Sequence, residues 1–201
     1  MTRHHPLKIL CVALASAGLS GAAFAQLPMS ASPPPSQAPS PPIEPIGAHP
    51  AGSTLSHGDR KFIEDAARDG MAEIELGKLA QQHAASDQAK QLGSKMIQDH
   101  GKAGDELRRI AEAKGVKMPT EPSMMQRHEA DKFSKLNGGD FDKAYADAMV
   151  KDHEKAVKTF TKESTEAKDP DVRSFAAQTL PTLKEHLQLA QAAQQAAGGR
   201  K

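Results

Sequence analysis

Met96-Ile97-Gln98-Asp99-His100-Gly101-Lys102-Ala103 lies in the middle of a long helical pattern, and its motif, M-x-x-D-H-x-K-A, returns at Met149-Val150-Lys151-Asp152-His153-Glu154-Lys155-Ala156. In each copy the methionine and the histidine are four residues apart, so they lie on the same face of a helix. Apolar residues continue that face in both directions. We therefore expect His100 and His153 on the inward faces of two helices, halfway along a helical bundle.

Residues 1–25 are typical of a secretory signal peptide, because a basic start is followed by an apolar run and by small residues that end at Ala25. The one cysteine, Cys11, lies in this run, so the mature chain is expected to contain no disulfides or thiolate metal sites. Residues 26–57 are rich in proline and predict a disordered linker. This linker is either a spacer or a ligand for a proline-binding partner.

The charge balance argues against nucleic acid as a partner. The chain has 26 Lys and Arg residues against 25 Asp and Glu residues, and no basic surface is predicted. With no tryptophan and one tyrosine, it also lacks aromatic residues on which bases could stack. No long apolar stretch follows the signal segment, so no membrane span is expected.

Apolar residues spaced three and four apart predict four long helices and a short one. The expected ranges are 59–84, 87–114, 123–136, 140–167 and 170–196, followed by a frayed tail at 197–201. Ser86-Asp87 and Asp169-Pro170 are helix start signals, and Gly115 is a stop signal. Pro181 is expected to kink the last helix.

The connections near Ala85 and Asp169 are so short that the helices on either side must form antiparallel hairpins. Residues 115–139 are long enough to cross back along the bundle. We therefore predict that residues 58–196 form an all-α, ferritin-like four-helix bundle. Its two antiparallel hairpins are joined by a long crossover that carries the short extra helix.

Polar side chains interrupt the inward faces at one height. Four of them lie at about the same number of residues from the hairpin turns: Asp69, His100, His153 and His186. Glu73 lies one helical turn from Asp69. A buried polar group left unpaired costs about 1–3 kcal/mol. We therefore expect these groups to pair with one another, with water or with a metal ion.

Three interpretations of this layer stay open. It could be a hydrogen-bonded layer that fixes helix register, a site for a single transition-metal ion, or a centre of acid–base chemistry. The metal site would use Asp69, Glu73, His100, His153 and His186. The residues expected to support these ligands are Asp99, Asp152, Tyr145, Met96 and Met149. Methionine beside imidazole suits copper, but methionines at helical spacing are also ordinary core residues.

Several phrases that occur in order over residues 58–193 resemble the bacterial family called domain of unknown function 4142. They are Glu73-Ile74-Glu75-Leu76-Gly77-Lys78-Leu79-Ala80, both M-x-x-D-H motifs, Gly139-Asp140-Phe141-Asp142-Lys143-Ala144-Tyr145 and Leu180-Pro181-x-Leu183-x-x-His186-Leu187. The resemblance implies a secreted protein, often labelled an outer-membrane protein, with a ferritin-like fold. It implies no established activity.

Di-iron ferritin-like proteins use Glu-x-x-His motifs, and no histidine of this chain has a glutamate three residues before it. The residues three before the histidines of the layer are Ile97, Val150 and Leu183. We therefore expect a mononuclear site rather than a ferroxidase centre, if metal is bound.

Two functions follow as hypotheses. The first is a non-catalytic bundle of the bacterial periplasm, in contact with the outer membrane or free of it, that acts in envelope stress or interaction. The second is a metal-binding protein or oxidoreductase that uses iron, copper or zinc. An envelope partner and a homodimer are both compatible with the sequence.

Overall fold

The computed structural model describes residues 55–198 of the 201-residue chain. The expected signal peptide, most of the expected linker and residues 199–201 lie outside the described residues. The last residues assigned to the linker already belong to the fold. Leu55 is buried, Ser56 caps the first helix and His57 begins it.

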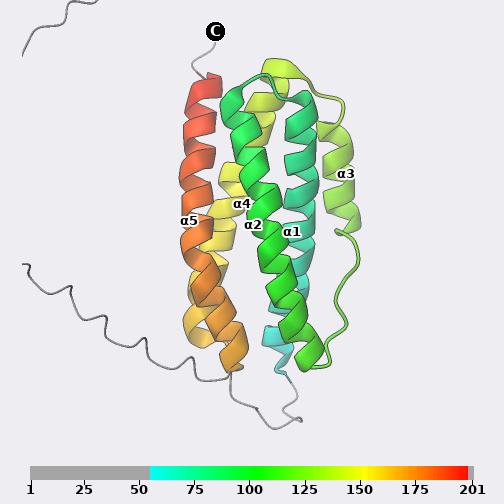
Figure 1. Cartoon of the computed structure of the whole chain (residues 1–201), viewed down its shortest axis with the longest axis vertical. Coiled ribbons are helices and arrows are strands. Elements are labelled where there is room, and N and C mark those ends of the chain that lie inside the picture. Colours follow the sequence, from blue (N-terminus) through cyan, green and yellow to red (C-terminus); the bar gives the residue numbers. More distant parts are fainter. Residues whose placement is uncertain (1–54, 199–201) are drawn as a thin grey trace, which may run out of the picture. The chain divides into compact units, whose positions relative to one another are not determined.

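All five expected helices are present (Figure 1). They are α1 (His57–His83), α2 (Asp87–Ala113), α3 (Met124–Phe133), α4 (Gly138–Glu166) and α5 (Pro170–Gly198). Within residues 55–198 the only pairing of β type is an isolated bridge between Ala84 and Gly138. The prediction of an all-α fold is therefore confirmed.

Local sequence sets most of these boundaries. The side chains of Ser56, Ser86 and Ser123 accept hydrogen bonds from backbone N–H groups in the first turns of α1, α2 and α3. After α2, Gly115 has a φ of 65°, and the Val116 N–H bonds back to the Ala111 carbonyl. This left-handed residue is the glycine stop signal of the sequence.

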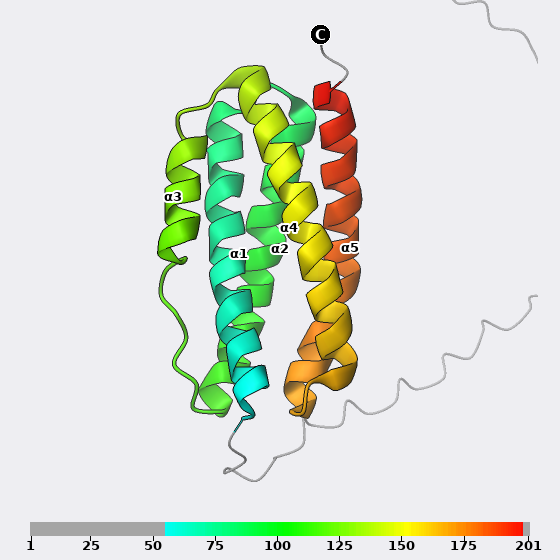
Figure 2. The ribbon, with the colours of Figure 1, turned by 180° about the vertical axis from the view of Figure 1, so that it is seen from behind.

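The helices form two antiparallel hairpins, α1–α2 and α4–α5, and α3 lies in the crossover between them (Figures 1 and 2). Beyond these pairs, α2 packs against α5, whereas α3 contacts both α1 and α4. As a result α2 and α4 run in the same direction on opposite sides of the bundle. The two M-x-x-D-H-x-K-A motifs therefore face each other across the bundle axis.

The core consists of two apolar clusters with a polar layer between them. One cluster surrounds Leu92, Phe141 and Tyr145, near the α1–α2 turn. The other surrounds Phe62 and Phe175, near the α4–α5 turn. Along every long helix the residues of the layer fall between these two groups.

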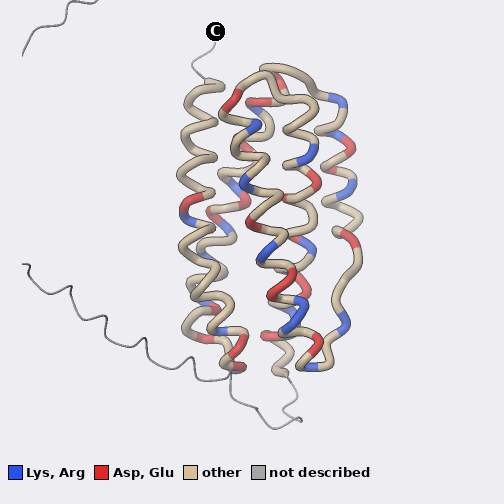
Figure 3. Tube along the Cα trace, in the orientation of Figure 1, with Lys and Arg blue, Asp and Glu red and all other residues tan. Residues whose placement is uncertain are grey.

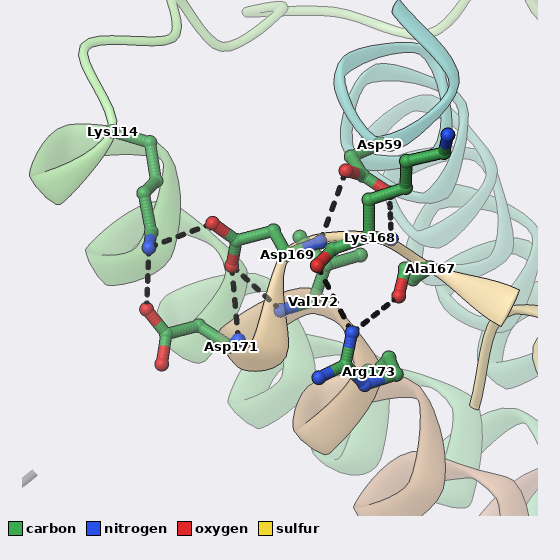
Figure 4. Close-up of polar contacts among 8 residues, drawn as sticks. All are labelled: Asp59, Lys114, Ala167, Lys168, Asp169, Asp171, Val172 and Arg173. Atoms are coloured by element: carbon green, nitrogen blue, oxygen red, sulfur yellow. Dashed lines mark hydrogen bonds and ion pairs between the residues drawn. The ribbon is translucent and has the colours of Figure 1, made fainter. Parts of the chain in front are cut away.

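Each hairpin binds the turn of the other through one carboxylate. Asp59, in the first turn of α1, accepts hydrogen bonds of 3.0 and 3.1 Å from the backbone N–H groups of residues 168 and 169 (Figure 4). Asp142, early in α4, accepts bonds of 3.1 and 3.0 Å from those of residues 85 and 86. These contacts fix the relative height of the hairpins.

Further polar contacts surround the α4–α5 turn (Figure 4). The Asp169 carboxylate caps α5, as expected, by accepting from the N–H groups of Asp171 and Val172. The buried ammonium of Lys114 lies 2.8 Å from Asp169 and 2.7 Å from Asp171. Arg173 donates to two carbonyls of the turn.

The helices α1 and α2 approach each other closely at Gly77 and Gly93. A Cβ placed on Gly77 would lie 2.7 Å from the Gly93 carbonyl oxygen, and one on Gly93 would lie 2.8 Å from that of Gly77. No side chain fits between the two backbones without a shift. Glycine is therefore required at this crossing.

Basic and acidic residues alternate along the helices rather than gathering in blocks of one sign (Figure 3). Helix α5 continues through Pro181 as a single helix. In the part of the chain that the structure describes, no helix combines the length and the apolar character needed to cross a bilayer.

Candidate metal centre

Each long helix contributes one side chain to the layer at mid-bundle. They are Glu73 from α1, His100 from α2, His153 from α4 and His186 from α5. Only 7% of Glu73 and 8% of His100 are exposed, and His153 and His186 are fully buried. The structure thus brings together four of the five ligands expected from the sequence.

The three imidazoles converge on one point. Their ring centroids lie 5.2 to 5.8 Å apart. One ring nitrogen from each lies within 4.8 Å of its counterparts on the other two. Ligand nitrogens of a tetrahedral ion with bonds of about 2.0–2.1 Å stand about 3.4 Å apart. To enclose one ion, the rings would have to bring these nitrogens from within 4.8 Å of one another to about that separation.

Each of the three imidazoles has one ring nitrogen without a hydrogen-bond partner. His153 Nδ1 lies 2.9 Å from the Met149 carbonyl, and His186 Nε2 lies 3.0 Å from Asp99 Oδ2. Both partners only accept, so these nitrogens donate and the opposite nitrogen of each ring carries a lone pair. Those opposite atoms, His153 Nε2 and His186 Nδ1, have no hydrogen-bond partner, nor does His100 Nε2.

Glu73 lies between two of the rings. Its Oε2 is 3.1 Å from His100 Nε2, and its Oε1 is 3.8 Å from His153 Nε2. The first distance is short enough for a hydrogen bond, but the direction is not that of one, since His100 Nε2 remains without a partner. The Glu73 carboxylate therefore lies beside the histidines but leaves their ring nitrogens without a hydrogen-bond partner.

Burial keeps the layer nearly free of charge. It lowers the pKa of His100 to about 4 and also lowers the pKa of His153 and of His186. Burial likewise raises the pKa of Glu73 to about 7, although the nearby His153 opposes this shift. At neutral pH the imidazoles are therefore unprotonated, which is the form that binds metal ions.

Asp99 holds His186 in place. Burial tends to raise the pKa of Asp99, but the hydrogen bonds from Lys95 and His186 together lower it. The Lys95 ammonium lies 2.9 Å from Asp99 and 3.5 Å from Glu185. Asp99 was expected to support the ligands, and it does so for a histidine on a neighbouring helix, whereas the contribution of Lys95 was not anticipated.

The structure leaves Asp69 out of the layer. Its side chain is 50% exposed and accepts a hydrogen bond of 2.6 Å from Gln126 on α3. Asp69 was expected on the inward face of α1, but the buried line that leads to Glu73 runs through Ile63 and Ala67. Asp69 lies at the edge of α1, beside α3.

The other expected supporting residues surround the layer. Met96, Met149 and Tyr145 are fully buried in the apolar cluster on one side of it. The Tyr145 hydroxyl has no hydrogen-bond partner. Burial, with a contribution from the charge of Glu73, raises the Tyr145 pKa. Burial also raises the pKa of Asp152, which is partly buried beside His153, to about 6.

The site therefore offers three neutral nitrogen donors and one carboxylate, all buried. Imidazole with carboxylate suits zinc, iron and copper ions, and one positive ion would satisfy all three unpaired nitrogens. These residues fit a single transition-metal ion. The described residues contain no second cluster of three or more such ligands at comparable spacing.

Fold and layer together define a ferritin-like four-helix bundle with histidines at mid-height. The sequence profile described as Domain of unknown function (DUF4142) matches residues 45–193, and the chain belongs to this family. The fold is similar to the crystal structure of a Streptomyces coelicolor protein described as secreted, DUF305. That similarity has a TM-score of 0.60 and 13% identity, covering 70% of this chain and 92% of the other. No curated protein matches the sequence.

Proposed function

We propose that this chain is a secreted protein of the bacterial envelope whose bundle binds one transition-metal ion: iron, copper or zinc. Two observations carry this proposal: one ring nitrogen from each of three buried histidines lies within 4.8 Å of the other two, and each of these rings has a buried nitrogen that lacks a hydrogen-bond partner. A layer needed only for packing would pair these atoms, because each unpaired buried group costs about 1–3 kcal/mol. One bound ion satisfies all of them together.

The residues of the layer have separate roles in this proposal. His100, His153 and His186 bind the ion, and Glu73 supplies the negative charge that offsets it. Asp99 orients His186 and selects the ring nitrogen that faces the ion. A bound transition metal would supply Lewis-acid or electron-transfer chemistry.

Catalysis on an organic substrate is not part of the proposal. Two surface pockets lie at α3 and between α2 and α5, lined by residues such as Met125 and Leu189, and neither is lined by a ligand of the layer. Storage, transfer or buffering of a metal in the periplasm is a better match to a buried site. We place the protein in the periplasm. Association with the outer membrane and homodimerisation are both compatible with this proposal.

A second candidate is a non-catalytic bundle that acts in envelope stress or interaction, with a layer that only fixes helix register. The observation in its favour is that polar groups of the layer already contact one another. Glu73 lies 3.1 Å from His100, and Asp99 bonds His186, both without a metal. Polar layers of this kind specify register in some bundles.

Titration of chelator-treated protein with Co²⁺ and Zn²⁺ separates the two candidates. The metal-binding proposal predicts one ion per chain, with Co²⁺ absorption bands typical of nitrogen and oxygen ligands. Replacing His153 with Phe should abolish this signal, whereas His128→Phe, on the surface of α3, should leave it intact. A folded wild-type protein that binds neither ion would favour the purely structural layer.

A further inference from the structure

The layer lies between two helix–helix interfaces, one between α2 and α5 and the other between α1 and α4, which we call seams. The charged side chains of the two seams differ. At the seam between α2 and α5, the carboxylates of Asp99 and Glu185 share the Lys95 ammonium. At the opposite seam, between α1 and α4, the corresponding carboxylates are Asp69 and Asp152. The cations that act on them are Lys155, whose ammonium is 4.0 Å from Asp69 and whose side chain is 76% exposed, and Lys151, whose charge acts on Asp152.

Helix α3 adds polar groups to the seam between α1 and α4. Gln126 donates a hydrogen bond of 2.6 Å to Asp69, and Glu129, one turn further along α3, contributes to the raised pKa of Asp152 through its negative charge. Three helices thus bring together the carboxylates of Asp69, Glu129 and Asp152, because the charges of the first two both act on the third. We call these three residues the acidic seam.

The acidic seam continues inward to the unpaired histidines. Asp69 lies one turn before Glu73 on α1, and the negative charges of Asp69 and Asp152 both act on Glu73. At the inner end, Glu73 Oε1 lies 3.8 Å from Nε2 of His153, a fully buried nitrogen without a hydrogen-bond partner. Carboxylates therefore extend from the protein surface to a nitrogen that is free to bind an ion.

We infer that divalent transition-metal ions reach the layer through the α1–α4 seam, attracted and passed inward by Asp69, Glu129 and Asp152. This inference rests on the proposed metal site. A row of carboxylates between low-dielectric walls concentrates cations and raises their rate of association. Lys155, at the mouth of the seam, opposes this attraction. The seam between α2 and α5 offers no comparable route, because Lys95 occupies its carboxylates.

The rate of Co²⁺ uptake tests the route. Chelator-treated whole protein is mixed with Co²⁺ in a stopped-flow instrument, and the absorption of the bound ion is followed. Asp69→Asn/Asp152→Asn should slow uptake about tenfold at low ionic strength, with one ion still bound per chain at saturation. Lys155→Gln should accelerate it about twofold to threefold. The difference among variants should shrink as salt is added, because salt screens exposed charges.

The matched control is Glu75→Gln/Glu154→Gln. It removes the same two charges from the same two helices, close to Glu73 and His153, but from exposed positions that turn away from the seam. The control should take up Co²⁺ at the wild-type rate. Because Lys155→Gln changes the rate in the opposite direction, a slow variant cannot be explained by damage to the fold alone.

Two results would overturn the route while leaving the metal site intact. One is saturable binding of one Co²⁺ per chain with a wild-type rate in Asp69→Asn/Asp152→Asn. The other is equal slowing in the control, which would show general attraction by surface charge. If the wild-type protein took up no Co²⁺ or Zn²⁺ at all, both the site and the route would be refuted.

Discussion

The carboxylate of Glu73 on α1 lies 3.1 Å from Nε2 of His100 on α2, yet the two groups are not aligned as a hydrogen bond. Burial raises the pKa of Glu73 to about 7 and lowers that of His100 to about 4. A stable ion pair would shift both pKa values in the opposite directions. The pair is therefore better suited to sharing a third, positively charged partner than to neutralising itself.

Replacing Glu73 with Gln should have opposite effects on the metal-free and metal-bound protein. Above pH 7 the metal-free variant should be more stable by about 1–3 kcal/mol, because a buried carboxylate is removed. Metal affinity should fall by at least about tenfold, because a charged ligand is lost. Chemical unfolding with chelator and Zn²⁺ titration measure the two effects. Lower stability together with unchanged affinity would assign Glu73 a structural role only.

The free energy of unfolding of the metal-free protein should rise between about pH 4 and pH 6.5. The pKa of His100 is lowered to about 4 from 6.5, and those of His153 and His186 are lowered too. In this window the unfolded chain binds more protons at these imidazoles than the folded chain does, so stability increases with pH.

Glu73 contributes with the opposite sign. Because its pKa is raised from 4.5 to about 7, its contribution to stability is lost as the pH rises through that range. Asp152 and Asp69, whose pKa values burial also raises, act in the same direction as Glu73, so the rise that the three histidines cause should be shallow up to about pH 6.5 and should flatten or reverse above it. Urea unfolding at pH 4.5, 5.5, 6.5 and 7.5 with chelator checks this, and Glu73→Gln should steepen the rise. A steady decline over this range would contradict the burial of neutral imidazoles.

Replacing Asp99 with Ala should weaken metal binding without removing a ligand. His186 would lose the acceptor that fixes its Nε2 as the donor, so the ring could rotate or exchange its proton between nitrogens. We expect affinity for Zn²⁺ to fall about 10–100-fold. Asp105→Ala, which removes an exposed carboxylate from the same helix, should leave affinity unchanged. Equal affinities for the two variants would show that Asp99 does not position His186.

The crossing of α1 and α2 predicts opposite effects for two glycine substitutions. Gly77→Ala should destabilise the protein by about 1–3 kcal/mol, because the new Cβ would lie 2.7 Å from the Gly93 carbonyl oxygen. Gly101→Ala should stabilise it by about 0.5–1 kcal/mol, because the site is helical and has no atom within 4 Å of the new Cβ. Thermal unfolding distinguishes them, and a stabilising Gly77→Ala would disprove the close contact.

The reciprocal contacts between hairpins predict a loss of stability when Asp59 is replaced with Ala. Two backbone N–H groups of the α4–α5 turn would lose a charged acceptor, at a cost of about 2–3 kcal/mol. Asp142→Ala should have a similar effect at the other turn. Asp140→Ala is the control, because this exposed first-turn residue binds neither turn. Unfolding by urea measures all three variants.

Much of the fold could be predicted because its signals are local. Serine caps, the Gly115 stop and apolar periodicity each act within a few residues, so the order and approximate limits of the helices follow from the sequence. The ends differ by a few residues; for example, α4 begins at Gly138 rather than at Asp140. The contacts of Asp59 and Asp142 with distant turns were not predicted, because no local pattern reveals a partner more than fifty residues away.

The site was predicted in part for a similar reason. Equal distances from the hairpin turns identified the three histidines, whose helices carry clear apolar stripes. On α1 two acidic residues one turn apart lay close to the same stripe, and the sequence did not show which one faced inward. The rotation of α1 is set by its close contact with α2 at Gly77 and Gly93. That contact turns Glu73 inward and leaves Asp69 beside α3.

The metal content of the native protein tests the central claim most directly. Wild-type protein isolated from bacterial envelopes without chelator would be compared by elemental analysis with His100→Ala/His153→Ala. The account predicts about one transition-metal ion per wild-type chain and none in the double variant. Wild-type protein without metal, isolated from metal-replete cells, would contradict it, as would equal metal content in the two proteins.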